Sequence, residues 1–325
     1  MKAVWYEKFG EAADVLTYGD MPDPTPAAGE VVVRVHATGV NPSDAKLRSG
    51  ARPGSVMAYP RIIPHSDGAG EIVAVGAGVD KARIGQRVWI WNGQWKRAFG
   101  TAAELVALPS EQAVAMPDQV RFEDAACFGI PAMTAWAAVF AGGPVEGKTV
   151  LVTGGAGTVG RYACQMARLG GARVITTVSS AEKAAHSTAE EWVNYRTSDV
   201  TDEVMEMTNG TGVDRIVDVD FGANQASSLA LIKEAGGIAA YASAADMAPV
   251  LQFYPFMFKN VALHMLIVYC LDPAMRRRGE AQLTEWLANN ALSHAAVPSG
   301  QLADAAAGHD KVMAAEKLGT VVLSV

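Results

Sequence analysis

A glycine-rich turn, GGAGTVG, separates an apolar run of strand length from a helical pattern near the middle of the chain. The run KTVLVTG (148–154) predicts a β-strand, and TVGRYACQMARLG (158–170) predicts a helix. Gly155 permits a tight turn, Gly157 lets a pyrophosphate approach the backbone, and Gly160 lets the helix pack closely on the strand. Because the motif ends a strand and opens a helix, whose N-terminus attracts phosphate groups, it predicts a dinucleotide-binding βαβ unit.

Strand-like and helix-like segments alternate along the chain from about residue 121. A helical stretch (122–140) comes first, and apolar runs of strand length then alternate with helical patterns, which is typical of a doubly wound parallel sheet. Beyond the glycine turn, the predicted strands are 172–178, 213–220 and 237–243, and the predicted helices are 181–189, 201–210 and 223–236. We predict one further strand at 256–269, and then a tail of two helices and a last strand, TVVLSV.

The first third of the chain has β character. Three stretches (29–41, 68–79 and 85–93) are rich in strand-forming residues and are bounded by turn signals. Short strands of this kind favour a small antiparallel or barrel-like domain. A chain of 325 residues is long enough for two domains, so we expect a β-rich domain followed by an α/β domain.

The composition argues against several classes of protein. A net charge of −7 and a pI near 5.4 are unlike a nucleic-acid-binding surface, and the basic cluster 276–278 is interpreted as a solvated helix end. No apolar run reaches the ~20 residues of a membrane helix. The N-terminus lacks signal-peptide features, so we expect a cytoplasmic protein without membrane spans. Cys127, Cys164 and Cys270 are interpreted as small buried apolar residues.

The end of the second predicted strand carries no carboxylate. Sites that prefer NAD usually place Asp or Glu there, about 20 residues beyond the glycines, to bind the ribose 2′-hydroxyl. This chain has TVSS (177–180), followed by Lys183. Hydroxyl donors and an ammonium group favour a 2′-phosphate, which a carboxylate would repel, so the pattern predicts NADP(H). Alternatively, Ser179 caps the next helix and Lys183 is only solvated; both interpretations can hold together, and Glu182 weakens the first.

The chain resembles the medium-chain dehydrogenase/reductases, and among them the zinc-independent quinone oxidoreductases related to zeta-crystallin. The motifs that carry the likeness are ATGVNPSDAKLRSG (37–50), DGAGEIVAVGAGV (67–79), IGQRVW (84–89), AAELVALP (102–109), GIPAMTAW (129–136), the glycine turn and LGTVVLSV (318–325). The resemblance implies an α/β protein with a GroES-like β-rich domain (1–121 and 270–325) and an inserted Rossmann domain with a doubly wound parallel sheet (122–269). It also implies that substrate and nicotinamide meet in a cleft.

The positions at which zinc-dependent relatives carry ligands hold other residues in this chain. The resemblance places Asn41 where those relatives have a Cys, Ser66 where they have a His, and Ile130 where they have another Cys. His65 lies one position away and is interpreted as structural. Asn, Ser and Ile cannot form a tetrahedral zinc site, so we expect no metal.

Without a Lewis acid, hydride transfer needs an acceptor that is already electrophilic, such as a quinone or a conjugated carbonyl. Asn41 is the first candidate for a donor to the carbonyl oxygen, and ordering the loop before Pro42 is its alternative role. Arg52 stands near the place of a family tyrosine and, with Lys46, makes the loop more cationic. Tyr59 is either a proton donor or a packing element.

The cofactor would be lined by residues on several elements. The resemblance implies that Thr134 and the strand end at 242–243 lie near the nicotinamide, and that the backbone of 266–268 holds its carboxamide. Tyr195 follows the third strand and could reach the 2′-phosphate. The predicted cofactor site is Thr134, Gly155, Ala156, Gly157, Thr158, Val159, Gly160, Ser179, Ser180, Lys183, Tyr195, Ala242, Ser243, Leu266, Ile267 and Val268. The stretch 256–269 would give a homodimer its sheet edge.

Three functions follow as hypotheses. The first is an NADPH-dependent reductase that transfers hydride to a quinone without a metal. The second is a reductase of enones or enoyl-thioesters on the same scaffold, which the cationic loop favours if the substrate is anionic. The third is a protein that binds NADPH without catalysis, as lens crystallins do in the family that the chain resembles.

Overall fold

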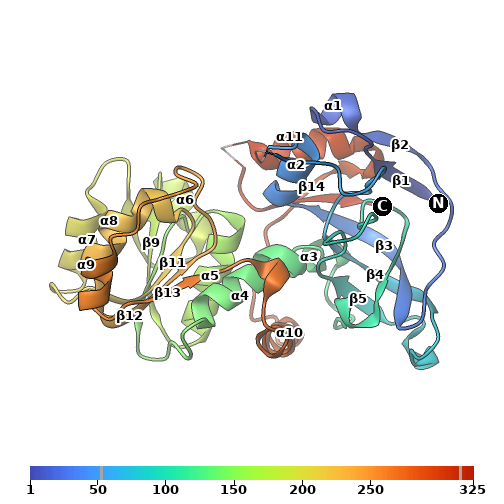
Figure 1. Cartoon of the computed structure of the whole chain (residues 1–325). Helices are drawn as coiled ribbons and strands as arrows, with labels where there is room; N and C mark the ends of the chain where they lie inside the picture. The colour runs from blue at the N-terminus through green and yellow to red at the C-terminus, as the bar shows by residue number, and fades with distance from the viewer. Residues whose placement is uncertain (52–53, 315–316) are drawn as a thin grey trace. The chain divides into compact units, whose positions relative to one another are not determined.

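The computed structural model describes residues 1–51, 54–314 and 317–325. The chain forms two compact units, Met1–Ile130 with Glu280–Val325, and Pro131–Gly279 (Figure 1). The units change over at residues 130 and 279, later along the chain than the domain boundaries predicted at 121 and 269, which stay predictions. Within the described ranges, no helix is both long and apolar enough to cross a bilayer.

The second unit is built on one parallel sheet of six strands. These are β8 (Thr149–Val152), β9 (Arg173–Val178), β10 (Glu191–Asn194), β11 (Val213–Asp218), β12 (Ile232–Ala240) and β13 (Ala262–Met265). Their order is β10-β9-β8-β11-β12-β13, and all neighbouring pairs are parallel. The chain winds outward from β8 on one side and from β11 on the other, so the predicted doubly wound sheet is confirmed, with its switch point between these two strands.

Helices connect successive strands of this sheet (Figure 1). The connecting helices are α5 (Thr158–Leu169), α6 (Ala181–Ser187), α7 (Val200–Met207), α8 (Phe221–Leu231) and α9 (Phe253–Phe258). The helix α4 (Met133–Phe140) precedes the first strand, and α10 (Pro273–Ala288) follows the last. The apolar runs of the central strands form the core: Leu151, Ile175, Ile216 and Ile238 are each at most 1% exposed. Burial of these runs on both faces explains why they read as continuous apolar strands.

For two predicted elements of this unit, the predicted bounds differ from those in the structure. The helix expected over 223–236 ends at Leu231, because Ile232 instead pairs with Val213 of β11 and is buried. The strand expected over 256–269 contains the end of α9, then β13, then a short 3-10 turn, η4 (Val268–Cys270). The polar Lys259-Asn260 pair interrupts it: Lys259 Nζ donates to the carbonyls that end α8, and Asn260 has a positive φ of 51°.

The predicted helical stretch 122–140 is also not one helix. It contains α3 (Phe122–Ala125), a π-helical turn (Phe128–Ala132) and α4. Pro131 lies inside the π-helical turn, where its missing N–H and its ring interrupt regular α-helical bonding.

The first unit is mostly antiparallel. Its large sheet has the order β14-β15-β3-β4-β5-β7, with β6 paired to β3, and β1 pairs with β2 separately. The strands are β1 (Lys2–Trp5), β2 (Thr17–Asp20), β3 (Glu30–Val40), β4 (Asp67–Val75), β5 (Arg87–Ile90), β6 (Leu105–Pro109), β7 (Ala113–Ala115), β14 (Ala296–Gln301) and β15 (Thr320–Ser324). The helices are α1 (Ala12–Val15), α2 (Pro42–Ser49), α3 and α11 (Ala305–Met313). The β-rich start and the last strand are therefore confirmed, whereas β1, β2, β6, β7 and β14 were not predicted.

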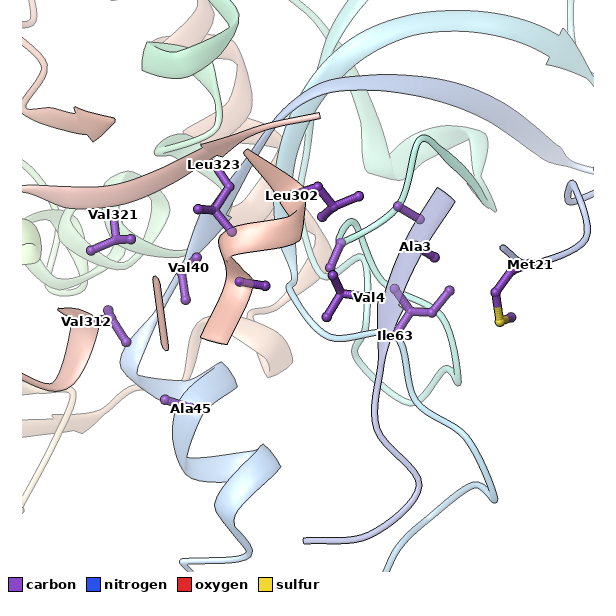
Figure 2. Close-up of a cluster of buried hydrophobic side chains, with 13 residues drawn as sticks. Ala3, Val4, Met21, Val40, Ala45, Ile63, Leu302, Val312, Val321 and Leu323 are labelled. Atoms are coloured by element: carbon purple, nitrogen blue, oxygen red, sulfur yellow. The ribbon is translucent and has the colours of Figure 1, made fainter. Parts of the chain in front are cut away.

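One buried cluster joins the two ends of the chain in this unit (Figure 2). Val321 and Leu323 of β15 pack with Val40 of β3 and with Val312 of α11. Because β15 also pairs antiparallel with β3, the C-terminal strand is an integral part of the first unit.

Two interpretations drawn from composition are wrong. Cys270 is exposed, unlike the buried Cys127 and Cys164. In the cluster interpreted as a solvated helix end, Arg276 is only 6% exposed, although Arg277 and Arg278 are exposed.

Candidate functional site

The glycine turn is packed so tightly that two of its glycines admit no side chain. A Cβ on Gly155 would lie 2.0 Å from Thr176 Oγ1 of β9, and a Cβ on Gly160 would lie 2.3 Å from the carbonyl oxygen of Gly154. Gly154 itself has a φ of +68°, which favours glycine. The lack of a side chain at Gly155 lets the turn lie close to β9, and the lack of one at Gly160 lets α5 pack closely on the turn.

Gly157 differs from the other fingerprint glycines. It precedes α5 with an ordinary φ of −69°, and the nearest atom to an added Cβ is the Gly154 carbonyl oxygen at 3.3 Å. The protein's own packing therefore requires this glycine less than its neighbours. A backbone without a side chain beside the N-terminus of a twelve-residue helix is the arrangement that a phosphate group can approach closely.

Hydrogen bonds hold the turn rigidly between two strands. Gly154 N–H donates to Thr177 Oγ1 at 3.0 Å, and Gly155 N–H donates to the Thr177 carbonyl at 3.2 Å. On the other side, Thr153 Oγ1 donates to Asp218 Oδ1 at 3.0 Å. The loop is therefore shaped by the chain itself before any ligand binds.

The carboxyl end of β9 presents hydroxyl groups and no carboxylate. Ser179 is 8% exposed. Ser180, and not Ser179, caps α6: its Oγ accepts the Lys183 N–H at 3.2 Å. A serine therefore caps α6, as the alternative interpretation expected, but the capping residue is Ser180 and not the predicted Ser179. Glu182 is exposed in the first turn of α6.

Lys183 and Tyr195 flank this strand end. The Tyr195 N–H donates to the carbonyl of Val178 at 3.1 Å, which sets the end of β10 beside the end of β9. The Tyr195 side chain is 50% exposed. Lys183 is half-buried, and its ammonium group has no hydrogen bond or ion pair within residues 1–51, 54–314 and 317–325.

The remaining predicted cofactor residues follow β12 and β13. Ser243 Oγ accepts the Gly222 N–H at 3.0 Å, and the Ala242 carbonyl accepts the Phe221 N–H at 3.0 Å, so both brace the start of α8. Leu266–Val268 follow β13, and Leu266 N–H donates to the Ala240 carbonyl at 2.8 Å. Because all six strands are parallel, these segments share one sheet edge with the glycine turn. Thr134 lies in α4 and is 7% exposed.

In the first unit, Asn41 lies in a buried polar corner. It follows β3 and precedes Pro42, which begins α2. The Asn41 N–H donates to Asp44 Oδ2 at 2.8 Å, and Asn41 Nδ2 donates to Asp67 Oδ2 at 2.9 Å. Asp67 begins β4 opposite Gly39, so the ends of two paired strands bring the amide and the carboxyl group together.

Burial weakens the acidity of both carboxyl groups in this corner. Asp44 is 4% exposed, and desolvation raises its pKa from 3.8 to about 7, although hydrogen bonds from Asn41 act in the opposite direction. Asp67 is fully buried, and desolvation raises its pKa well above the usual value. Gly129 passes so close that a Cβ there would lie 2.3 Å from Asp67 Oδ1. The corner is thus dry and carries less negative charge near neutral pH than two ordinary carboxylates would.

The three zinc-ligand positions do not fit a zinc ion. Asn41 is bonded to Asp67, Ser66 is 2% exposed, and Ile130 has no donor atom. No group of three or more His, Cys, Asp or Glu suited to a metal occurs among the residues that the structure describes. The absence of a metal stays a prediction that rests on residue types.

A second buried network lies on the other side of Asp67. His65 Nδ1 is 3.0 Å from Thr38 Oγ1, which donates to the Asp67 carbonyl at 3.2 Å. His65 Nε2 is 3.0 Å from His309 Nε2 of α11, and both rings are fully buried. Desolvation lowers the pKa of each imidazole, that of His309 to about 3, so both are neutral. The structural interpretation of His65 agrees with this packing.

The other predicted substrate residues have different surroundings. The Tyr59 hydroxyl donates to the Lys96 carbonyl at 2.7 Å, and its ring packs beside the cluster around Tyr6, which favours the packing role. Lys46 is exposed on α2. Arg52 lies outside the described residues.

Sequence reasoning assigned no role to Asp67 or to His309. Asp67 carries a local signal, since it opens the DGAGE segment whose strand pairs with the one before Asn41. His309 carries none, since its partner His65 lies 244 residues away in the sequence.

Two family models match the chain. One, described as "Alcohol dehydrogenase GroES-like domain", matches residues 27–118, and the other, described as "Zinc-binding dehydrogenase", matches residues 158–288. They confirm the predicted combination of a GroES-like domain with a Rossmann domain. The name of the second model describes that family as a whole, and this chain has Asn, Ser and Ile at the three positions discussed above.

Similar proteins agree with these matches. The quinone oxidoreductase of Rattus norvegicus is 31% identical over 242 residues, which are 73% of this chain and 72% of that protein. That of Homo sapiens is 30% identical over 245 residues, with the same coverage. A solved mycobacterial protein complexed with NADPH has a TM-score of 0.87 at 30% identity and covers 100% of both chains. With its parallel sheet, glycine turn and relatives of this extent, the chain belongs to the medium-chain dehydrogenase/reductase family, within its quinone oxidoreductases.

Proposed function

We propose that this protein transfers a hydride from NADPH to a quinone or another conjugated carbonyl compound without a metal ion. The observation that carries the proposal is the carboxyl end of β9, where hydroxyl groups and a half-buried ammonium group stand in place of a carboxylate. The names of the relatives, and the mycobacterial structure with NADPH, support the same chemistry.

The cofactor's phosphates would be held by the second unit. Gly157 and the first N–H groups of α5 would bind the pyrophosphate, because this helix end has partial positive charge and the turn is already shaped. Ser179, Lys183 and Tyr195 would bind the 2′-phosphate. Ser180 Oγ already accepts a backbone N–H, but its hydroxyl hydrogen remains available to a phosphate oxygen.

Bound NADPH supplies the hydride. Asn41 would donate an N–H to the acceptor's carbonyl oxygen, where negative charge develops as the hydride arrives. An amide nitrogen has two N–H groups: Asp67 accepts one from Asn41, and the other, which also interacts with the Asp44 carboxyl group, would be offered to the acceptor. Since burial raises the pKa of Asp44 to about 7 and that of Asp67 well above its usual value, the corner repels that charge less than two ordinary carboxylates would.

The residue types also restrict the acceptor. With Asn41, Ser66 and Ile130 at the zinc-ligand positions, the site would lack a Lewis acid to polarise a simple ketone. A quinone or an α,β-unsaturated carbonyl delocalises the incoming charge over its own conjugated system. These compounds therefore fit the site better than simple ketones or alcohols.

Reduction of an anionic enone or enoyl-thioester is the second candidate, and exposed Lys46 on α2 is the observation that favours it. Binding of NADPH without catalysis is the third. We further propose that the protein is cytoplasmic, and that the outermost strand β13 provides the edge for a homodimer.

The test is turnover with a panel of acceptors. Purified protein and NADPH are mixed with a neutral quinone, a neutral enone, an enoyl-thioester and a simple ketone, and loss of nicotinamide absorbance is followed. We expect rapid loss with the quinone and none with the ketone. Preference for the enoyl-thioester, reduced in Lys46→Gln, would support the second candidate. Tight NADPH binding without turnover of any acceptor would refute the proposed enzyme.

A further inference from the structure

The segment Leu266–Val268 lies beyond the outermost strand of the Rossmann sheet. β13 has one neighbouring strand, β12, and the Leu266 N–H bond to the Ala240 carbonyl continues that pairing. After this bond the backbone leaves the sheet, and Val268 begins the 3-10 turn η4. A segment with only one flanking strand needs another contact if its backbone groups are to keep a fixed direction.

Arg276 provides such a contact. Its Nη2 donates to the carbonyl oxygen of Val268. Arg276 is 6% exposed and Val268 is 4% exposed, so the bond is shielded from water. Asp272 fixes the start of α10, because its Oδ1 accepts the N–H groups of Ala274 and Met275, each at 3.0 Å. The Arg276 guanidinium therefore lies in the first turns of a helix whose start is fixed by a cap.

The burial of Arg276 is selective within its own cluster. Arg277 and Arg278 are exposed on the same helix, so the cluster is not a uniform basic surface. Taking a guanidinium out of water is costly unless its hydrogen bonds are satisfied. The planar donor fork of arginine can hold a carbonyl in one direction, whereas a lysine ammonium is a rotating point charge.

We propose that Arg276 is a positioning residue for the nicotinamide, and this inference rests on the proposed function. In a doubly wound sheet the two halves of a dinucleotide lie over the two halves of the sheet. The glycine turn and the end of β9 belong to the half proposed to bind the adenosine phosphates, so the nicotinamide belongs over β11–β13. By fixing the Val268 carbonyl, Arg276 sets the direction of the peptide groups at Leu266–Val268 that pair with the carboxamide.

The test compares a ligand that has the nicotinamide with one that lacks it. Calorimetry measures the binding of NADPH and of 2′-phospho-ADP-ribose to the full chain and to Arg276→Met. We expect the variant to bind NADPH about tenfold more weakly, as for loss of a charge-assisted hydrogen bond, and to bind 2′-phospho-ADP-ribose as the unchanged protein does. Arg276→Lys should recover part of the lost affinity, and Arg278→Met should bind both ligands normally.

Each result separates the inference from the function on which it rests. Equal weakening of both ligands in Arg276→Met, or of neither, overturns the role of Arg276 while the proposed function stands. An unchanged protein that binds neither ligand refutes the proposed function itself. If Arg276→Met does not fold, Arg276→Lys carries the comparison, with selective weakening of NADPH still expected and equal affinities still contradictory.

Discussion

The Asn41 side-chain amide donates to the carboxyl group of Asp67 at 2.9 Å, and both side chains are buried. The bond joins the residue that follows β3 to the first residue of β4. It fixes which way the amide faces, since this oxygen of the Asp67 carboxyl group accepts the hydrogen bond and the amide nitrogen donates it. Asp67 therefore determines where the second N–H of Asn41 points.

Replacing Asp67 should lower catalysis through Asn41. Asp67→Leu removes the acceptor, so we expect kcat to fall about tenfold or more while the affinity for NADPH stays unchanged. Asp67→Asn can still accept the amide N–H with its own carbonyl oxygen, and it should retain most of the activity. The measurement is kcat together with calorimetric NADPH binding for both variants. Equal losses in the two variants would show that orientation of Asn41 is not the cause.

Asp44 should make stability depend on pH in a particular direction. Its pKa is about 7 in the folded protein against 3.8 for the ordinary carboxyl group, so the folded state binds the proton more strongly. The associated stabilisation is full below pH 4 and is lost as the pH rises towards 7. Asp44→Asn is neutral throughout, so its stability relative to the unchanged protein should increase from pH 4 to pH 7. Urea unfolding at these two pH values measures this, and a constant difference contradicts it.

The His65–His309 pair should make stability depend on pH in the direction opposite to that of Asp44. Burial, and then Arg48, lower the His309 pKa from 6.5 to about 3, so the unfolded chain binds the proton more strongly. This contribution to stability is present above pH 6.5 and is lost on acidification towards pH 3, by roughly 1 kcal/mol per pH unit. His309→Gln should show a shallower loss between pH 6.5 and pH 4. If the stabilities of the two proteins changed with pH in parallel, the claim that the folded protein holds this histidine pair uncharged would be wrong.

Substitutions at two glycines of the turn should have different effects, one on stability and the other on NADPH binding. Gly160→Ala places a Cβ 2.3 Å from a backbone oxygen, so we expect destabilisation of several kcal/mol, on the order of that for other strained backbone sites. Gly157→Ala meets nothing closer than 3.3 Å, so its melting temperature should stay nearly unchanged. It should nevertheless lose most of its NADPH affinity, because the methyl group occupies the phosphate's approach. Normal NADPH binding by a folded Gly157→Ala protein would contradict the assigned site.

Local patterns predicted the parts of the molecule that local chemistry determines. The glycine turn and the hydroxyl-rich end of β9 lie within about thirty residues, and the structure brings them together at one sheet edge as expected. The resemblance also pointed to Asn41. Distant pairings were not predictable: Ile232 joins a strand because Val213 is beside it, and His309 meets His65 only after the chain returns to the first unit. Arg276 looked solvated because its burial depends on the turn that it contacts.

Lys183 should determine the preference for the phosphorylated cofactor. Lys183→Gln removes the ammonium group, so we expect NADPH affinity to fall about tenfold with NADH affinity unchanged, as for loss of one charged contact. Lys148→Gln is the matched control, because Lys148 precedes β8 at the opposite end of the strand. Calorimetric titration of the three proteins measures this effect. Equal losses for both dinucleotides would remove Lys183 from the phosphate site.

The most direct measurement is a pair of calorimetric titrations of the unchanged protein, one with NADPH and one with NADH, under the same conditions. The end of β9 offers hydroxyls and an ammonium group to a 2′-phosphate and has no carboxylate for a 2′-hydroxyl. We therefore predict that NADPH binds at least about tenfold more tightly than NADH. Equal affinities, or tighter binding of NADH, would contradict the account.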